Sequence, residues 1–129
     1  MCLDIVRTPK KLKADGIGYK MFRKNRSGNL YFRHSVGKRV PLPTEKWINE
    51  KDYRNHWHKH EETIIAYGHV PYPIGFHIYR NKKLSTGFVY VDCVLISVKF
   101  RKACAKGIQG GINTIVAKEI FIQSEVKHG

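Results

Sequence analysis

The sequence predicts an α+β fold: a compact single domain over residues 1–129, dominated by antiparallel β-strands with one or two short helices. The length of 129 residues suits one domain with one core. Hydrophobic residues make up 42% of the chain and aromatic residues 12%, as in folded proteins. The apolar residues form short segments rich in Val, Ile, Phe and Tyr, separated by Gly, Pro and Asn, and this pattern is typical of strands joined by turns.

The first predicted strands form a hairpin behind a basic arm. Residues 1–15 are expected to be an extended N-terminal arm, because several lysines follow Pro9. Residues 19–24 and 30–36 mix apolar and basic side chains as strands do, and the Arg-Ser-Gly-Asn sequence between them signals a turn. The lysines of the arm are Lys10, Lys11 and Lys13.

The middle of the chain is expected to carry the helical part of the fold. Thr44 can cap a short helix that runs through Trp47 and Ile48. Residues 50–66 are polar and predict a loop with some helix. A strand is expected at 74–79, after the stiff Val-Pro-Tyr-Pro connector.

The C-terminal third contains the strongest β signal. Residues 88–100 are rich in Val, Ile, Phe and Tyr and predict a long strand. Residues 103–112 are expected to be a loop, because three glycines there indicate a tight turn between strands. A last strand is predicted at 114–122, and residues 123–129 are expected to be a frayed tail. The three glycines are Gly107, Gly110 and Gly111.

Positive charge is the main compositional feature. The chain has 24 Lys and Arg residues against 10 Asp and Glu, a formal net charge of +14. Residues 1–46 contain twelve basic and three acidic groups, and residues 76–107 contain seven and one. Two such blocks attract nucleic acids and nucleotides, although the same charge can serve solubility alone. The sequence therefore predicts a polyanionic partner: nucleic acid, a nucleotide or a nucleic-acid-containing host complex.

The candidate binding residues belong to these two blocks. Their cations are interleaved with aromatic residues, and rings that stack on bases beside cations that hold phosphates are typical of single-strand binding. Ordinary amphipathic strands, with rings inward and cations in water, are the alternative. The predicted phosphate-binding residues are Arg23, Lys24, Arg26, Arg33, Lys38, Arg39, His77, Tyr79, Arg80, Lys82, Lys83, Arg101 and Lys102.

His77 supports two hypotheses, since it is embedded between Phe76 and Ile78 in an apolar predicted strand. It is either a core or rim group satisfied by one hydrogen bond, or a ligand-contacting or acid–base group at the edge of a pocket. Glu119, in the last predicted strand, is expected to pair with an arginine at the edge of the core, or else to serve a site. We favour a binding protein. The alternative is an enzyme that acts on a nucleotide and uses His77 and Glu119 for catalysis.

Neither a metal nor a cofactor is expected. His56, His58 and His60 alternate, and on a strand their imidazoles would face one side. Lysine and glutamate residues surround them, and so a polar surface segment is the preferred interpretation. The three cysteines are odd in number and lack metal-ligand spacing, which predicts free thiols in a reducing compartment. They are Cys2, Cys93 and Cys104.

A cytoplasmic protein without a membrane partner is expected. No apolar run is long enough to span a membrane. The N-terminal sequence Met-Cys-Leu-Asp-Ile-Val-Arg lacks the pattern of a secretory signal. The sequence does not indicate an oligomeric state.

Several short motifs follow one another in an order similar to that of small bacteriophage and prophage proteins. They are Met1-Cys2-Leu3, Tyr19-Lys20, Gly75-Phe76-His77, Cys93, Gly107 and Val116-Ala117-Lys118-Glu119-Ile120. The resemblance covers most of the chain loosely, and the family has no assigned activity. Its members usually carry a helical stretch after Gly-Phe-His, whereas only residues 80–87 intervene here. The resemblance implies a viral accessory protein in the cytoplasm of an infected bacterium.

The positive charge and the resemblance to phage proteins together predict a phage-type accessory protein that binds a polyanionic target. Countering a host defence system is one role that this prediction includes. One alternative is a small nucleotide-directed enzyme that uses His77, which should show a deep pocket around that residue. Another is a protein that docks on an acidic host protein, which should show an exposed apolar patch rimmed by Lys and Arg. A nucleic-acid binder should instead show a broad positive face.

Overall fold

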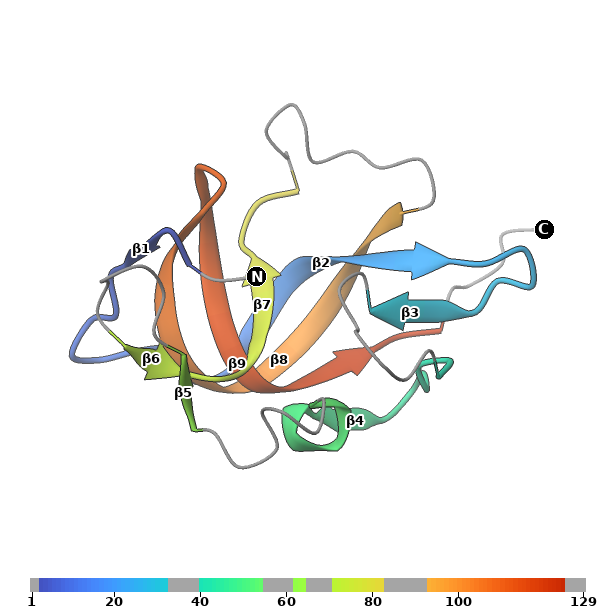
Figure 1. The fold of residues 1–129 in the computed structure, drawn as a ribbon, viewed down its shortest axis with the longest axis horizontal. Helices are drawn as coiled ribbons and strands as arrows, with labels where there is room; N and C mark the ends of the chain where they lie inside the picture. Colours follow the sequence, from blue (N-terminus) through green and yellow to red (C-terminus); the bar gives the residue numbers. More distant parts are fainter. Residues whose placement is uncertain (1–2, 33–39, 55–61, 65–70, 83–92, 125–129) are drawn as a thin grey trace.

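The computed structural model describes residues 3–32, 40–54, 62–64, 71–82 and 93–124, and these are almost entirely β-structure (Figure 1). The prediction of a small domain dominated by antiparallel strands is confirmed, whereas the helix content of the described residues is a single 3-10 turn. No helix in this part of the chain is long and apolar enough to cross a membrane. The elements are β1 (Ile5–Val6), β2 (Gly16–Lys24), β3 (Leu30–Phe32), β4 (Trp47–Asn49), η1 (Glu50–Tyr53), β5 (Thr63–Ile64), β6 (Tyr72–Pro73), β7 (Phe76–Tyr79), β8 (Cys93–Gln109) and β9 (Ile112–Ile122).

Seven strands form one sheet in the order β1-β8-β2-β7-β9-β4, and β3 pairs with β2. Because β8 also pairs with β9, the strands β8, β2, β7 and β9 form a closed circuit. Figure 1 shows that the long strands β8 and β9 bend strongly to make this closure. A second, two-stranded sheet consists of β5 and β6.

Strand β7 is covered on both faces, because side chains alternate along a strand. Phe76 and Ile78 belong to the larger buried cluster. His77, between them, has its ring against Tyr72, which belongs to the smaller cluster. The other buried members of that smaller cluster are Leu3, Ala105 and Val116.

The expected helix after Thr44 is wrong. Trp47 and Ile48 lie in β4, which pairs with β9, and the Trp47 ring contacts Phe121 with centroids 5.5 Å apart. Burial against β9 therefore outweighs the local capping signal. The helical turn starts later, where the Asn49 side chain accepts a hydrogen bond from a backbone N–H at 2.9 Å and caps η1.

The expected loop at 103–112 is also wrong, because β8 continues through most of it. The turn is confined to Gly110 and Gly111, whose φ angles are 57° and 78°. Gly107 lies within the strand, where an added Cβ would stand 2.0 Å from the carbonyl oxygen of Ile5. Glycine at this position thus permits the close approach of β1.

The remaining predicted strands are confirmed within the described residues. Strands β2 and β3 form the N-terminal hairpin, and β7 and β9 match the predictions for 74–79 and 114–122. Strand β8 matches the later part of the strand predicted at 88–100. Residues 33–36, 88–92 and 125–129 of the predicted elements lie outside the described part of the chain.

Candidate anion-binding pocket

The N-terminal arm is attached to β8 at two separate points. The backbone N–H of Arg7 donates to the carbonyl oxygen of Lys106 at 2.7 Å, and the N–H of Ala103 donates to the carbonyl oxygen of Ala14 at 3.0 Å. Both bonds are formed by residues far apart in sequence. The intervening residues of the arm therefore form a fixed wall beside the sheet.

A pocket of about 260 Å³ lies beside this wall. Its lining carries one carboxylate, Asp15, and an apolar surface that includes the buried residues Phe100 and Ile115. Cations outnumber that carboxylate by four to one. They are Lys11, Lys13, Arg80 and Lys106. A hollow lined by one sign of charge concentrates the electrostatic potential and favours anions.

The sheet positions the pocket residues through strand register. Lys106 of β8 lies opposite Ile115 of β9. Arg80 directly follows β7, and its backbone N–H donates to Asn113 at 2.9 Å. Gly16 lies opposite Phe100, where an added Cβ would be only 2.7 Å from the ring. The cations thus come from the arm, from the end of β7 and from β8.

The pocket cations lack acidic partners within the described residues. None of the four lies within 4.0 Å of a carboxylate oxygen there. Lys11, Lys13 and Arg80 are exposed, and Lys106 is half-buried. Within the described residues, the mutual repulsion of these groups is therefore offset by solvent and by the single pocket carboxylate Asp15, and a bound anion would reduce it further.

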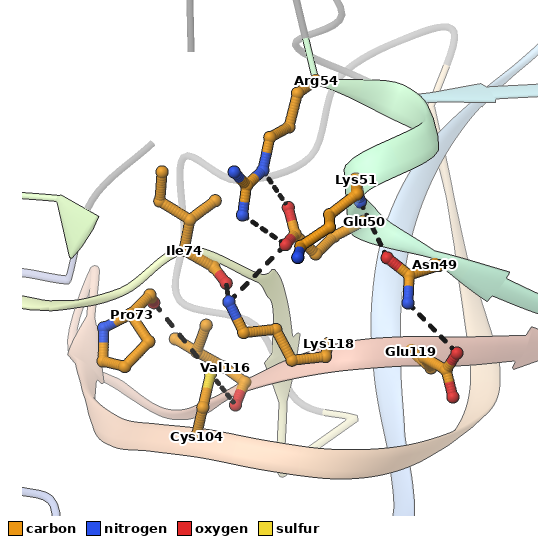
Figure 2. A network of polar contacts seen from close by, with 10 residues as sticks. All are labelled: Asn49, Glu50, Lys51, Arg54, Pro73, Ile74, Cys104, Val116, Lys118 and Glu119. Atoms are coloured by element: carbon orange, nitrogen blue, oxygen red, sulfur yellow. Dashed lines mark hydrogen bonds and ion pairs between the residues drawn. The ribbon is translucent and has the colours of Figure 1, made fainter. Parts of the chain in front are cut away.

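Four cations outside the pocket are paired with carboxylates in the described residues, and Figure 2 shows two of them, Arg54 and Lys118, around Glu50. Arg54 makes a two-pronged contact with the Glu50 carboxylate, with Nε donating at 2.6 Å. The ammonium of Lys118 lies 3.5 Å from the same carboxylate and donates to the carbonyl oxygen of Ile74. These pairs fasten η1 to β9 and give Arg54 and Lys118 a structural role.

Glu119 is the centre of a second paired cluster. Arg101 Nε donates to its carboxylate at 2.5 Å, Asn49 Nδ2 donates at 3.2 Å, and the Lys102 ammonium lies 3.3 Å away. The hydrogen bond from Arg101 is the main cause that lowers the pKa of Glu119. The Arg101 guanidinium also lies over the Trp47 ring, 4.1 Å from its centroid. The expected pairing of Glu119 with an arginine is confirmed.

His77 is half-buried and hydrogen-bonded, as expected for a core or rim group, the first of the two hypotheses that the sequence left open. Its Nε2 lies 3.2 Å from the Tyr72 hydroxyl, which accepts a hydrogen bond from the Leu3 N–H at 2.8 Å. Burial lowers the pKa of His77 to about 3, and the positive charge of Lys20 acts in the same direction. An imidazole with this pKa is a weak base at neutral pH. Its hydrogen-bond partner is Tyr72, whereas Glu119 is engaged with Arg101.

The other predicted binding residues do not gather at the pocket. Arg23 and Lys24 lie at the far end of β2, about 23 and about 26 Å from Gly16 by strand rise, and Arg26 lies in the turn that follows. Tyr79 is buried and lies opposite Tyr19. Lys82 is exposed, two residues after Arg80. Outside the described residues lie Arg33, Lys38, Arg39 and Lys83.

Three of the pocket cations were absent from the predicted binding set: Lys11, Lys13 and Lys106. The sequence marks the lysines of the arm as a basic cluster but does not assign them to a site. Their sequence signal was that cluster after Pro9, whereas their proximity to Arg80 depends on how the arm attaches to β8. No local pattern marks Lys106.

The described residues provide no new candidate for a metal site or a reactive thiol. Among the described residues, no three His, Cys, Asp or Glu side chains are arranged to hold a metal ion. The alternating histidines at 56, 58 and 60 lie outside that part, so the expectation of no metal stays a prediction. Neither Cys93 nor Cys104 forms a disulfide within the described residues, and burial raises the pKa of Cys104.

Comparison with known proteins gives no relative from which a function can be transferred. No protein-family model matches the chain, and no curated protein or solved structure matches it significantly. The resemblance to bacteriophage proteins therefore stays a prediction. The geometry of the described residues carries the functional argument.

Proposed function

We propose that the protein binds a phosphate-bearing polyanion, either nucleic acid or a nucleotide, at the pocket between the N-terminal arm and the sheet. One contrast carries the proposal. The cations around Glu50 and Glu119 are paired with carboxylates, whereas the four pocket cations converge on a hollow without such partners in the described residues. An anion in this hollow would be attracted by four cations and repelled by Asp15 alone.

Phosphate suits these side chains better than other anions do. Arg80 offers a planar fork of N–H donors that matches two phosphate oxygens. The lysines add compact charges whose donors rotate to reach the remaining oxygens. Four cations against Asp15 leave three net positive charges, which suits a multiply charged group.

The cellular role that we propose is that of a phage-type accessory protein, which engages a nucleic acid, a nucleotide or a nucleoprotein complex of the host, including one that belongs to a defence system. Its support is the order of the short motifs, together with the net charge of +14. Pull-down from the lysate of infected cells, with and without nuclease, tests this role. Capture of one host complex that is lost after nuclease treatment is the expected result, and equal recovery after nuclease would contradict it.

The two alternatives have less support in the described residues. A nucleotide-directed enzyme needs a base or acid that titrates near neutral pH, whereas burial lowers the pKa of His77 to about 3. A docking protein needs a contiguous apolar patch. The large apolar side chains that are exposed in this part come from three separate segments of the chain: Ile5, Ile17 and Val40.

Salt-dependent binding tests the proposed function directly. Fluorescence anisotropy of a labelled single-stranded oligonucleotide should give an affinity that falls steeply with salt. The expected slope of log K against log[salt] is about −0.7 for each phosphate that the protein neutralises. A slope near zero, or no binding at low salt, would contradict the proposal.

A matched pair of double variants assigns that binding to the pocket. Lys13→Gln combined with Arg80→Gln should weaken binding. It should also make the slope of log K against log[salt] shallower by the amount expected for about one to two lost phosphate contacts. Lys10→Gln combined with Lys46→Gln removes the same charge from exposed residues that do not line the pocket. Equal effects of the two double variants would show that net charge, and not the pocket, is responsible.

A further inference from the structure

We infer that the pocket recognises a phosphate monoester carried by a nucleotide, either a free mononucleotide or the phosphorylated end of a single strand, in preference to phosphodiesters within a chain. The inference rests on the proposed function, because it takes phosphate binding at this pocket as its premise. It adds the chemical form of the phosphate. Three properties of the pocket support it: its size, its charge and its apolar surface.

The size of the pocket favours the end of a ligand over the middle of a polymer. Its volume of about 260 Å³ is below the range of about 300–1,000 Å³ that is usual for drug-sized ligands. The arm that forms one wall is bonded to β8 on both sides of the pocket, at Lys106 and at Ala103. A backbone that continues in both directions needs an open groove, whereas a hollow of this size holds one phosphate and its sugar.

The charge of the pocket favours the monoester. A phosphate monoester carries a charge of about −1.5 to −2 at pH 7, because its second pKa is about 6. A diester within a chain carries a single negative charge. Since the pocket holds three net positive charges, the additional charge of the monoester strengthens attraction to each cation.

Apolar surface beside the cations favours a nucleotide over inorganic phosphate. Phe100 and Ile115 contribute to the pocket wall, and Ile17 lines it with 68% of its surface exposed. An isoleucine this exposed gains by covering its side chain with a sugar or a base. The arrangement places an apolar contact next to the group that holds the phosphate.

Two sets of probes separate the sources of the monoester. The first comprises the four 5′-nucleoside monophosphates, the matching nucleosides and inorganic phosphate, measured by calorimetry. The second is one single-stranded oligonucleotide with either a 5′-phosphate or a 5′-hydroxyl end. We expect at least one monophosphate to bind tenfold or more tightly than its nucleoside and than inorganic phosphate. If the pocket binds the end of a strand, the oligonucleotide with a 5′-phosphate should bind at least tenfold more tightly than the one with a 5′-hydroxyl.

Variants tie that preference to named side chains. Arg80→Gln and Lys106→Gln should each remove most of the gain from the 5′-phosphate, and Lys10→Gln should leave it intact. Ile17→Ser should weaken monophosphate binding while leaving inorganic phosphate unchanged. Circular dichroism and thermal unfolding show whether each variant is folded. Lys13→Gln, at an exposed position, replaces Lys106→Gln if the latter unfolds.

The outcomes distinguish the inference from its premise. If both oligonucleotide forms bind equally with a steep salt dependence, and no monophosphate binds better than its nucleoside, the inference is overturned and the proposed function stands. If neither oligonucleotide form nor any monophosphate binds at low salt, both are wrong. A preference that survives Arg80→Gln and Lys13→Gln together would place the monoester site elsewhere and also overturn the inference.

Discussion

The ammonium of Lys20 donates a hydrogen bond to the backbone carbonyl oxygen of His77, 3.0 Å away, and so connects β2 to β7. Two aromatic rings flank it, those of Phe32 and Phe76, with centroids 5.9 and 6.0 Å from Nζ. Burial lowers the pKa of Lys20 to about 8. A charged amine is therefore held in an apolar part of the sheet at neutral pH.

Replacing Lys20 should stabilise the protein at neutral pH. The folded pKa of about 8 is below the unfolded value near 10.5, so the unfolded state binds more protons between these limits and stability rises with pH across that window. Lys20→Met removes the buried charge and should raise the free energy of unfolding at pH 7 by about 1–3 kcal/mol. Urea unfolding from pH 7 to 10 should show a smaller rise for Lys20→Met than for the parent. Lys10→Met, at an exposed position, is the control, and identical pH profiles for parent and Lys20→Met would refute the prediction.

His77 should make the protein acid-sensitive. Its folded pKa of about 3 is below the ordinary histidine pKa of 6.5. The unfolded state therefore binds more protons between these values, and stability is lost as the pH falls from about 6.5 toward 3. His77→Asn has no group that titrates in this range, so it should flatten this acid limb while lowering stability at pH 7 through the altered contact with Tyr72. Denaturant unfolding between pH 4 and 7 measures both effects, and an unchanged acid limb would contradict the assignment.

The strands were predictable where local sequence and long-range pairing agree. Strands β2, β7 and β9 carry apolar residues in a pattern that matches their burial. The two errors have one cause, because pairing partners distant in sequence outweighed local signals. Gly107 indicates a turn locally, but it lies in a strand because β1 approaches it closely. Thr44 indicates a helix start, but Trp47 is held in a strand by β9.

The chemistry of the candidate site was predictable from composition, and its location was not. The excess of Lys and Arg indicated an anion as the partner. Which cations remain available depends on where the buried carboxylates Glu50 and Glu119 lie in the fold. Lys13 and Arg80 line the same pocket because hydrogen bonds attach the arm to β8. These bonds join residues far apart in the chain, and no local sequence pattern predicts them.

Glu50 and Glu119 are both buried carboxylates, but the cations that pair with them differ in exposure. The side chains of Glu50 and Arg54 are only 4% exposed or less. Those of Arg101 and Lys102, the partners of Glu119, are 40% and 62% exposed. Water can therefore solvate the cations around Glu119 after their partner is removed, whereas the buried Arg54 side chain would lose its two-pronged contact with Glu50.

Glu50→Gln should accordingly destabilise the protein far more than Glu119→Gln. Loss of one partner from a buried pair costs about 3–5 kcal/mol, and loss of an exposed pair costs about 0–1 kcal/mol. Both variants remove one negative charge, so they are matched in net charge. Urea unfolding at pH 7 measures the difference, and Glu50→Gln combined with Arg54→Met should recover part of the loss because no buried charge is left from that pair. Equal destabilisation by the two single variants would show that the contacts of Glu50 with Arg54 and Lys118 contribute no more than a surface pair, and that η1 is held to β9 by its apolar contacts instead.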